Sequence, residues 1–178
     1  MISRKQVRNM EILWAPWRYS YVEKVSEARK KECVLCRICR DRQDAKNYIF
    51  RRTPLSYAVL NIYPFNGGHV LIIPNRHVAD ISDLTLEERT DLFDLLVRVK
   101  ELMAAAFRPQ AFNVGMNLGA QAGAGIPEHL HIHVVPRWDG DVNFMPVLFN
   151  TKVLPVALDK VYKVLKDADK KRHRKAGK

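Results

Sequence analysis

The chain has 178 residues, which is enough for one domain with a hydrophobic core that needs no disulfide staples. Its formal net charge is +11, and so large a surplus favours an anionic partner: nucleic acid, a phosphate-rich metabolite or an acidic membrane surface. No apolar run approaches the roughly 20 residues of a transmembrane helix, and residues 1–10 lead into no apolar segment of a signal peptide. All three cysteines lie within residues 33–39, which favours a reducing, cytoplasmic setting with metal binding as the property to test.

Hydrophobic periodicity and breaker residues predict alternating strands and helices. In chain order, the predicted elements are a strand over 56–62, a turn over 64–68, a strand over 69–73, a helix over 85–107, a strand over 111–117, a Gly/Ala-rich loop over 119–125, a strand within 126–136 and a short helix over 153–165. Thr85 and Glu88 have the spacing of a capping box at the start of the long helix. The pattern indicates one α+β domain on a mainly antiparallel sheet.

The two ends of the chain differ from its middle. Residues 11–22 gather four aromatic side chains around one proline, which predicts packing onto the domain or a second subunit, with a platform for single-stranded nucleic acid as the alternative. Residues 166–178 carry seven basic and two acidic residues, which predicts a disordered basic tail that is either solubilising or in contact with nucleic acid. We therefore expect an N-terminal extension over 1–40, a domain over 41–165 and a tail over 166–178.

The segment His129-Leu-His-Ile-His-Val-Val135 holds three of the six histidines in strict alternation. Because alternate side chains of a strand share a face, we expect His129, His131 and His133 on one face, with neighbouring imidazoles roughly 6.5–7 Å apart. Such a row could bind a metal, supply a nucleophile or form an exposed polar face. The last alternative is the weakest, because histidine is not a favoured strand residue.

This alternation resembles the signature of the histidine triad (HIT) superfamily of nucleotide hydrolases and transferases. The hairpin segment 61–74 resembles that superfamily's second hallmark, and segments 13–18 and 135–145 resemble a prokaryotic branch of diadenosine polyphosphate phosphorylases or hydrolases. The resemblance implies a HIT-like fold and, as is common in the family, a homodimer whose sheet continues across both subunits.

The resemblance also implies roles for individual residues. His131 would attack the α-phosphorus of a nucleotide to form a nucleotidyl-histidine intermediate, which water or phosphate then resolves, and a backbone carbonyl near His129 would hold its other ring nitrogen. His133 and His69 would contact the phosphates, and Asn61 the ribose hydroxyls, with turn capping as the alternative for Asn61. The further candidates for binding nucleotide or phosphate lie around the Gly/Ala-rich loop: Asn117, Gln121, Gly123 and Gly125.

That loop could cradle phosphate with its backbone N–H groups or be a plain connection. Many hydrolases of the superfamily carry Gln, then Ser or Thr, where this chain has Gly125 and Ile126. Handling of the leaving group is therefore open, and Gln121 is the candidate substitute.

Cys33 and Cys36 form a CxxC motif, which by itself fits zinc, a redox pair or chance. Zinc would need two more ligands, for which His77 and His129 are candidates. The resemblance to HIT proteins and to galactose phosphate uridylyltransferases implies a closed, structural zinc site of these four residues, with Cys39 in place of Cys33 as the alternative.

The leading hypothesis is an enzyme that cleaves a dinucleoside polyphosphate through His131, with water or phosphate as acceptor. A purine nucleoside phosphoramidase of the same fold and a non-enzymatic nucleotide- or RNA-binding module are the alternatives. The base preference, the length of the phosphate bridge and the physiological substrate are open.

Overall fold

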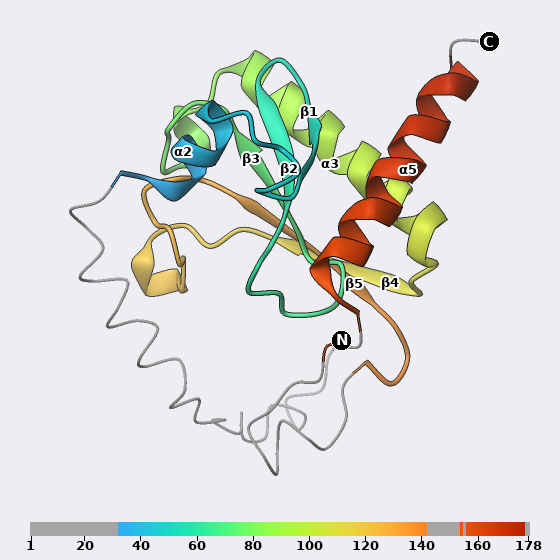
Figure 1. Cartoon of the computed structure of the whole chain (residues 1–178). Coiled ribbons are helices and arrows are strands. Elements are labelled where there is room, and N and C mark those ends of the chain that lie inside the picture. Colours follow the sequence, from blue (N-terminus) through green and yellow to red (C-terminus); the bar gives the residue numbers. More distant parts are fainter. Residues whose placement is uncertain (1–31, 142–153, 155, 177–178) are drawn as a thin grey trace, which may run out of the picture. The chain divides into compact units, whose positions relative to one another are not determined.

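The computed structural model describes residues 32–141, 154 and 156–176, and every structural statement below refers to these residues. Five strands form one sheet in the order β1-β2-β3-β5-β4, and each neighbouring pair is antiparallel (Figure 1). The strands are β1 (Ile49–Arg52), β2 (Ser56–Leu60), β3 (Val70–Pro74), β4 (Ala111–Gly115) and β5 (Ile132–Arg137). The helices are α2 (Val34–Arg40), α3 (Leu86–Phe107) and α5 (Leu158–Ala176), with short 3-10 turns at Ile81–Asp83 and Ala120–Ala122. The predicted α+β class with one antiparallel sheet is confirmed.

The two faces of the sheet are covered by different helices. Alternate residues such as Leu60, Ile72 and Val134 pack on one face against α3 and α5, while Tyr57 and Ile73 pack on the other face beside α2. Such alternation follows from the two-residue period of a strand. In the register of β3 with β5, Leu71 lies opposite His133, and Leu71 belongs to the core on the α2 side. His133 therefore lies on the α2 face of the sheet.

Helix α3 is confirmed within one residue of its predicted start. Thr85 is the N-cap, and its side chain and that of Glu88 form both hydrogen bonds of a capping box. Arg108 ends the helix in the left-handed conformation, just before Pro109. The buried apolar residues recur at helical spacing, and all but Leu102 belong to the core formed with the sheet: Leu92, Leu95, Val99, Leu102 and Met103.

Helix α5 differs from the expectation of a disordered tail beginning at residue 166. It continues to Ala176, although the composition of this segment offers few apolar residues. Val161 and Leu165 enter the core, and one turn later Asp169 is buried against Arg51 of β1 at 2.9 Å. This ion pair holds a charged stretch on the domain, which composition alone does not reveal. The aromatic segment 11–22 lies outside the described residues, and no helix in the described part is long and apolar enough to cross a membrane.

Candidate active site and metal centre

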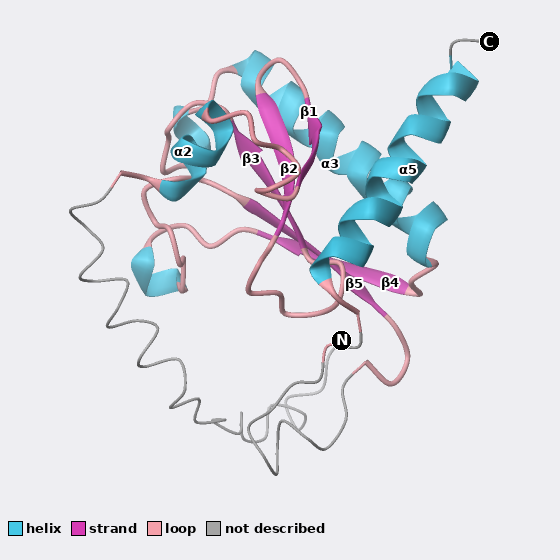
Figure 2. Ribbon diagram, in the orientation of Figure 1, coloured by secondary structure: helices cyan, strands magenta, loops and turns pink. Residues whose placement is uncertain are grey.

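The histidine segment follows the predicted alternation only in part. Strand β5 begins at Ile132, so His129 and His131 lie in the loop that leads into it and only His133 is in the strand (Figure 2). The rings of His131 and His133 are 5.0 Å apart between centroids, closer than the expected 6.5–7 Å. The expected spacing assumes two residues of a regular strand, and His131 lies just outside β5. The residues between the histidines, Leu130 and Ile132, are buried in the core as predicted.

His131 is held by the backbone of its own segment. Its Nδ1 lies 2.8 Å from the carbonyl oxygen of His129, and only 6% of the residue is exposed. A carbonyl oxygen only accepts, so Nδ1 carries the hydrogen and donates it. In neutral His131 the lone pair is therefore on Nε2, the nitrogen that would act as a nucleophile. This contact has the form expected from the family resemblance.

A second chain of hydrogen bonds orients His133. The backbone N–H of Phe65 donates to Nδ1 of His69 at 3.1 Å, so Nδ1 is the acceptor and Nε2 of His69 carries the hydrogen. That Nε2 donates to Nδ1 of His133 at 2.9 Å. His133 Nε2 consequently carries its own hydrogen, and this nitrogen is buried without a hydrogen-bond partner among the described residues. The arrangement leaves one oriented N–H donor beside His131.

Their surroundings keep His69 and His133 neutral. Burial, reinforced by the neighbouring imidazoles, lowers the pKa of His69 to about 3 and that of His133 to about 4. Both side chains are therefore uncharged at neutral pH, as the hydrogen-bond chain requires.

Two groups that sequence reasoning missed complete this part of the site. The Phe65 ring stacks on the imidazoles of His69 and His133, with centroid distances of 4.9 and 5.7 Å. The carbonyl oxygen of Pro74 lies 3.0 Å from Nε2 of His129. Phe65 and Pro74 both belong to the hairpin segment singled out in the sequence, but spacing says nothing about ring stacking or about backbone partners.

Asn61 makes the contacts of a turn cap. Its Oδ1 accepts from the Tyr63 backbone N–H at 2.9 Å, and its Nδ2 lies 3.3 Å from Nδ1 of His69. Asn61 is thus brought to the histidine cluster, and its role toward a ribose stays a prediction.

The Gly/Ala-rich loop precedes β5 and contains the 3-10 turn Ala120–Ala122. Gly119 and Gly123 adopt φ of 85° and 89°, a region that side chains disfavour. Asn117 donates to the Gly123 carbonyl at 3.4 Å, within the loop, and Gln121 is exposed. Neither Asn117 nor Gln121 makes a hydrogen bond to the histidines in the described part of the chain. The phosphate-binding role of this loop, Gly125 included, is likewise still a prediction.

The four predicted metal ligands come together from three separate elements. Cys33 is the N-cap of α2, Cys36 lies in its first turn, and His77 and His129 come from loops. Their ligand atoms all lie within 4.8 Å of one another. Nδ1 of His129 is 3.4 Å from both sulfur atoms, and Nδ1 of His77 is 3.2 Å from Cys36 Sγ. Zinc bonds of about 2.3 Å to sulfur and 2.0–2.1 Å to nitrogen at tetrahedral angles put such atoms about 3.5 Å apart, so the donor set fits zinc.

The surroundings of the four residues also suit a cation. Burial, together with the neighbouring thiol of Cys33, raises the pKa of Cys36 to about 11, so a bound cation is what would favour the thiolate. Burial lowers the pKa of His129, which keeps its imidazole neutral. Cys39 is turned to other partners: its thiol contacts Asn75 Oδ1 at 3.4 Å and the Arg52 guanidinium at 3.6 Å. The geometry therefore favours Cys33 over the alternative ligand Cys39.

Comparisons with known proteins agree with this geometry. A family model described as the HIT domain matches residues 42–140. The chain is 36% identical over 154 residues to the AP-4-A phosphorylase of Mycobacterium tuberculosis, covering 84% of this chain and 79% of the relative. It is 42% identical over 93 residues to an asymmetrical bis(5′-nucleosyl)-tetraphosphatase of Schizosaccharomyces pombe, covering 52% and 50% of the two chains. The crystal structure of a Zn-bound histidine triad family protein from Mycobacterium smegmatis has the same fold, with a TM-score of 0.65 at 24% identity, over 80% of this chain and 96% of the other.

Proposed function

Because this chain belongs to the HIT domain family, we propose that it cleaves a dinucleoside polyphosphate of the diadenosine tetraphosphate type at the α-phosphorus, with His131 Nε2 as nucleophile. The observation that carries the proposal is the 2.8 Å contact between His131 Nδ1 and the His129 carbonyl, which leaves the lone pair on Nε2. The relatives named for tetraphosphate cleavage or phosphorolysis support this substrate class.

The reaction has two displacements. Nε2 of His131 forms a bond to the α-phosphorus while the bond to the bridging oxygen breaks, and the rest of the polyphosphate leaves. An oxygen of water or phosphate then attacks the same phosphorus and breaks the P–N bond, which frees His131. Splitting the transfer in this way replaces one difficult step with two easier ones.

His133 supplies the oriented donor for these steps. Its buried Nε2–H has no partner among the described residues, and its tautomer is set by His69. A phosphate oxygen that gains charge as the bridge breaks would accept this hydrogen bond, and a preorganised donor is effective in a site from which water is excluded. Asn61 and the loop over 119–125 are proposed to hold the ribose and the flanking phosphates.

Zinc is proposed as a structural ion at Cys33, Cys36, His77 and His129. Four protein ligands close the coordination shell and leave no position for substrate. The His129 Nε2–H donates to the Pro74 carbonyl at 3.0 Å, which directs Nδ1 toward the sulfur atoms. His129 would thus anchor both the ion and the carbonyl that orients His131.

We also propose a homodimer, with β4 as the joining strand. β4 is an edge of the sheet, and most of its residues are exposed, including Val114 at 50%. Unpaired edge strands are templates for further pairing. Light scattering should give twice the chain mass, and Val114→Lys should shift the protein toward monomer. A monomeric wild-type protein would reject this part of the proposal.

The test of the activity is product analysis on diadenosine tetraphosphate, with and without phosphate. His131→Ala should abolish turnover, whereas Lys100→Ala, at an exposed position of α3, should not. ADP with ATP indicates phosphorolysis, and AMP with ATP indicates hydrolysis. Full activity of His131→Ala would reject the mechanism. Faster turnover of an AMP–lysine phosphoramidate than of the dinucleotide would assign the chain to the phosphoramidase alternative.

A further inference from the structure

The surplus of positive charge in this chain lies at its two ends. Residues 32–157 contain thirteen basic and thirteen acidic side chains and are neutral, so the whole surplus of +11 lies elsewhere. Residues 1–31 have eight basic and three acidic residues, and residues 158–178 have nine and three. The sheet and the histidine site thus belong to a segment that has no net charge, which we call the neutral body.

Four arginines of the neutral body form ion pairs that hold parts of the fold together. Arg52 pairs with Asp44, Arg76 with Glu88 and Arg137 with Asp141, at 2.7 Å in each case. Arg51 pairs with Asp169 of α5. Because basic and acidic residues are equal in number in the body, the surplus positive charge that would attract an external polyanion lies on the terminal segments.

Helix α5 divides this charge between two faces. Val161, Leu165 and Asp169, each four residues apart, are buried against the domain. A set of four lysines at spacings of 3, 10 and 11 residues from Lys160 is exposed on the other side, which we call the lysine face: Lys160, Lys163, Lys170 and Lys171. One exposed carboxylate, Asp167, lies on the same side, so the net charge of this side is +3. None of the four is in an ion pair with another described residue, and at 1.5 Å per residue they span about 16 Å of helix.

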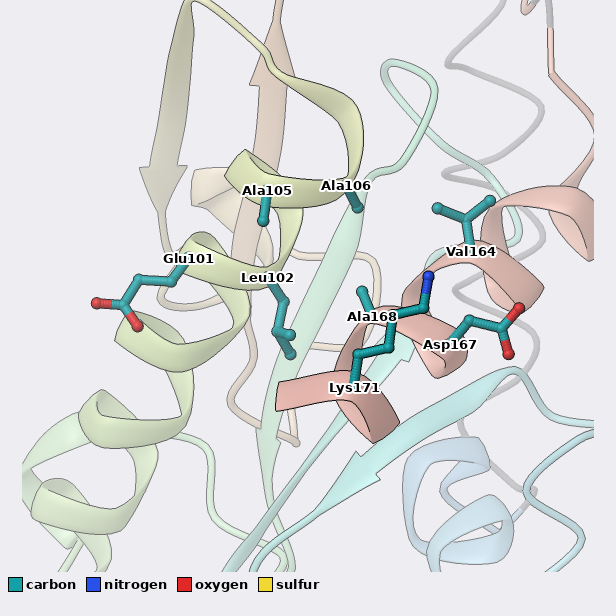
Figure 3. Close-up of a pocket in the computed structure, with 8 residues that line it drawn as sticks. All are labelled: Glu101, Leu102, Ala105, Ala106, Val164, Asp167, Ala168 and Lys171. Carbon is teal, nitrogen blue, oxygen red and sulfur yellow. The ribbon is translucent and has the colours of Figure 1, made fainter. Parts of the chain in front are cut away.

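The groove beside this helix is not suited to phosphate. It has a volume of about 520 Å³ between α3 and α5, and its floor includes Leu102, Ala106 and Ala168 (Figure 3). Its charged lining residues are Glu101, Asp167 and Lys171 of the lysine face, which together have a net charge of −1. The two carboxylates outnumber the one ammonium group in the groove, so contacts with a polyanion are expected mainly on the outer surface of α5.

We propose that the lysine face of α5 binds the phosphate backbone of a nucleic acid. Four ammonium groups along one helix face match a line of phosphates, and lysine makes such contacts without reading sequence. A membrane surface fits less well, because a helix that lies in a bilayer needs a free apolar face, and the apolar residues Val161 and Leu165 are already in the core.

The test compares two variants that remove the same number of positive charges. The first replaces the lysine face by Lys160→Gln, Lys163→Gln, Lys170→Gln and Lys171→Gln. The matched control replaces four exposed basic residues of the neutral body: Lys46→Gln, Arg89→Gln, Lys100→Gln and Arg108→Gln. Both keep the folded core intact, which circular dichroism melting would verify.

Binding of labelled 20-nucleotide RNA and DNA, single-stranded and duplex, is followed by fluorescence anisotropy between 50 and 200 mM salt. We expect the lysine-face variant to lose about 10²-fold in affinity at 50 mM salt, and the slope of log K against log salt to fall by about 3, since each phosphate contact contributes 0.7–0.9. The control should lose less than about threefold, and dinucleotide turnover should be unchanged in both. Equal losses in the two variants, or no loss in the first, would overturn the proposal. Binding to vesicles containing phosphatidylserine without binding to any oligonucleotide would overturn it in favour of a membrane.

Discussion

His69 Nε2 lies 2.9 Å from His133 Nδ1, and the backbone N–H of Phe65 on the far side of the His69 ring decides which of the two nitrogens donates. One main-chain hydrogen thus sets the tautomers of two side chains in succession. The result is a hydrogen on Nε2 of His133, whose ring lies 5.0 Å from that of His131.

Removing His69, the side chain that donates a hydrogen bond to His133, should slow the chemical step. In His69→Leu, nothing sets the tautomer of His133, and we expect kcat for diadenosine tetraphosphate to fall by roughly 10²-fold with a smaller change in KM. His69→Gln keeps an amide N–H that can donate to His133 and should recover part of the loss. Steady-state kinetics of the two variants tests this, and equal kcat values for His69→Leu and the wild type would contradict it.

Protonation of His69 and His133 should make the protein less stable in acid. The folded pKa values of His69 and His133, about 3 and about 4, lie below the value of about 6.5 for a free histidine. The unfolded chain therefore binds more protons below pH 6.5, so this part of the stability is complete above that pH and is lost as the pH falls toward 4.

Chemical denaturation from pH 7.5 to 4 measures the effect, at about 1.4 kcal/mol for each unit of pKa difference. The His69→Leu variant is the control, since the metal ligands contribute alike in both proteins. The wild type should lose more free energy of unfolding than the variant over this range. Parallel pH profiles would show that the pair does not titrate as described.

Variants at Cys36 and Cys39 should differ in the amount of zinc that they bind. Cys36→Ser removes a proposed ligand and should bring bound zinc, measured by atomic absorption, from about one equivalent to near zero. We expect a fall in Tm on the order of 10 °C, because metal binding adds to folding free energy. Cys39→Ser leaves all four proposed ligands and should keep the zinc. Loss of zinc from Cys39→Ser but not from Cys36→Ser would assign the site to the other cysteine.

The ion pair between Asp169 and Arg51 should contribute much of the stability of helix α5. Asp169→Ala leaves Arg51 in a mostly buried position without this carboxylate, and breaking such a pair costs about 3–5 kcal/mol. Asp167→Ala, two residues away and exposed, should change stability by less than about 0.5 kcal/mol. Urea unfolding of both variants decides the matter, and equal effects would show that the ion pair does not anchor the helix.

Hydrophobic periodicity and capping residues predict much of the fold, because these signals depend on residues that are close together in the sequence. The capping box at Thr85 and the apolar stripe of α3 are short-range features, and both appear as predicted. The course of α5 beyond residue 165 was not readable in the same way. The helix contacts the sheet there through Asp169 and Arg51, which are 118 residues apart, and no local pattern reports such a pair.

The sequence by itself identified the candidate residues, which are the alternating histidines and the CxxC motif, and the HIT family to which they point. It also determined that the surplus charge of +11 lies at the two ends of the chain. Only the tertiary structure decided that Cys33 and Cys36 meet His77 and His129, and which nitrogen of each histidine has a partner. The physical reason is that residue type and spacing are local, whereas a tautomer or a ligand set is defined by backbone atoms and side chains that only folding brings within hydrogen-bond distance.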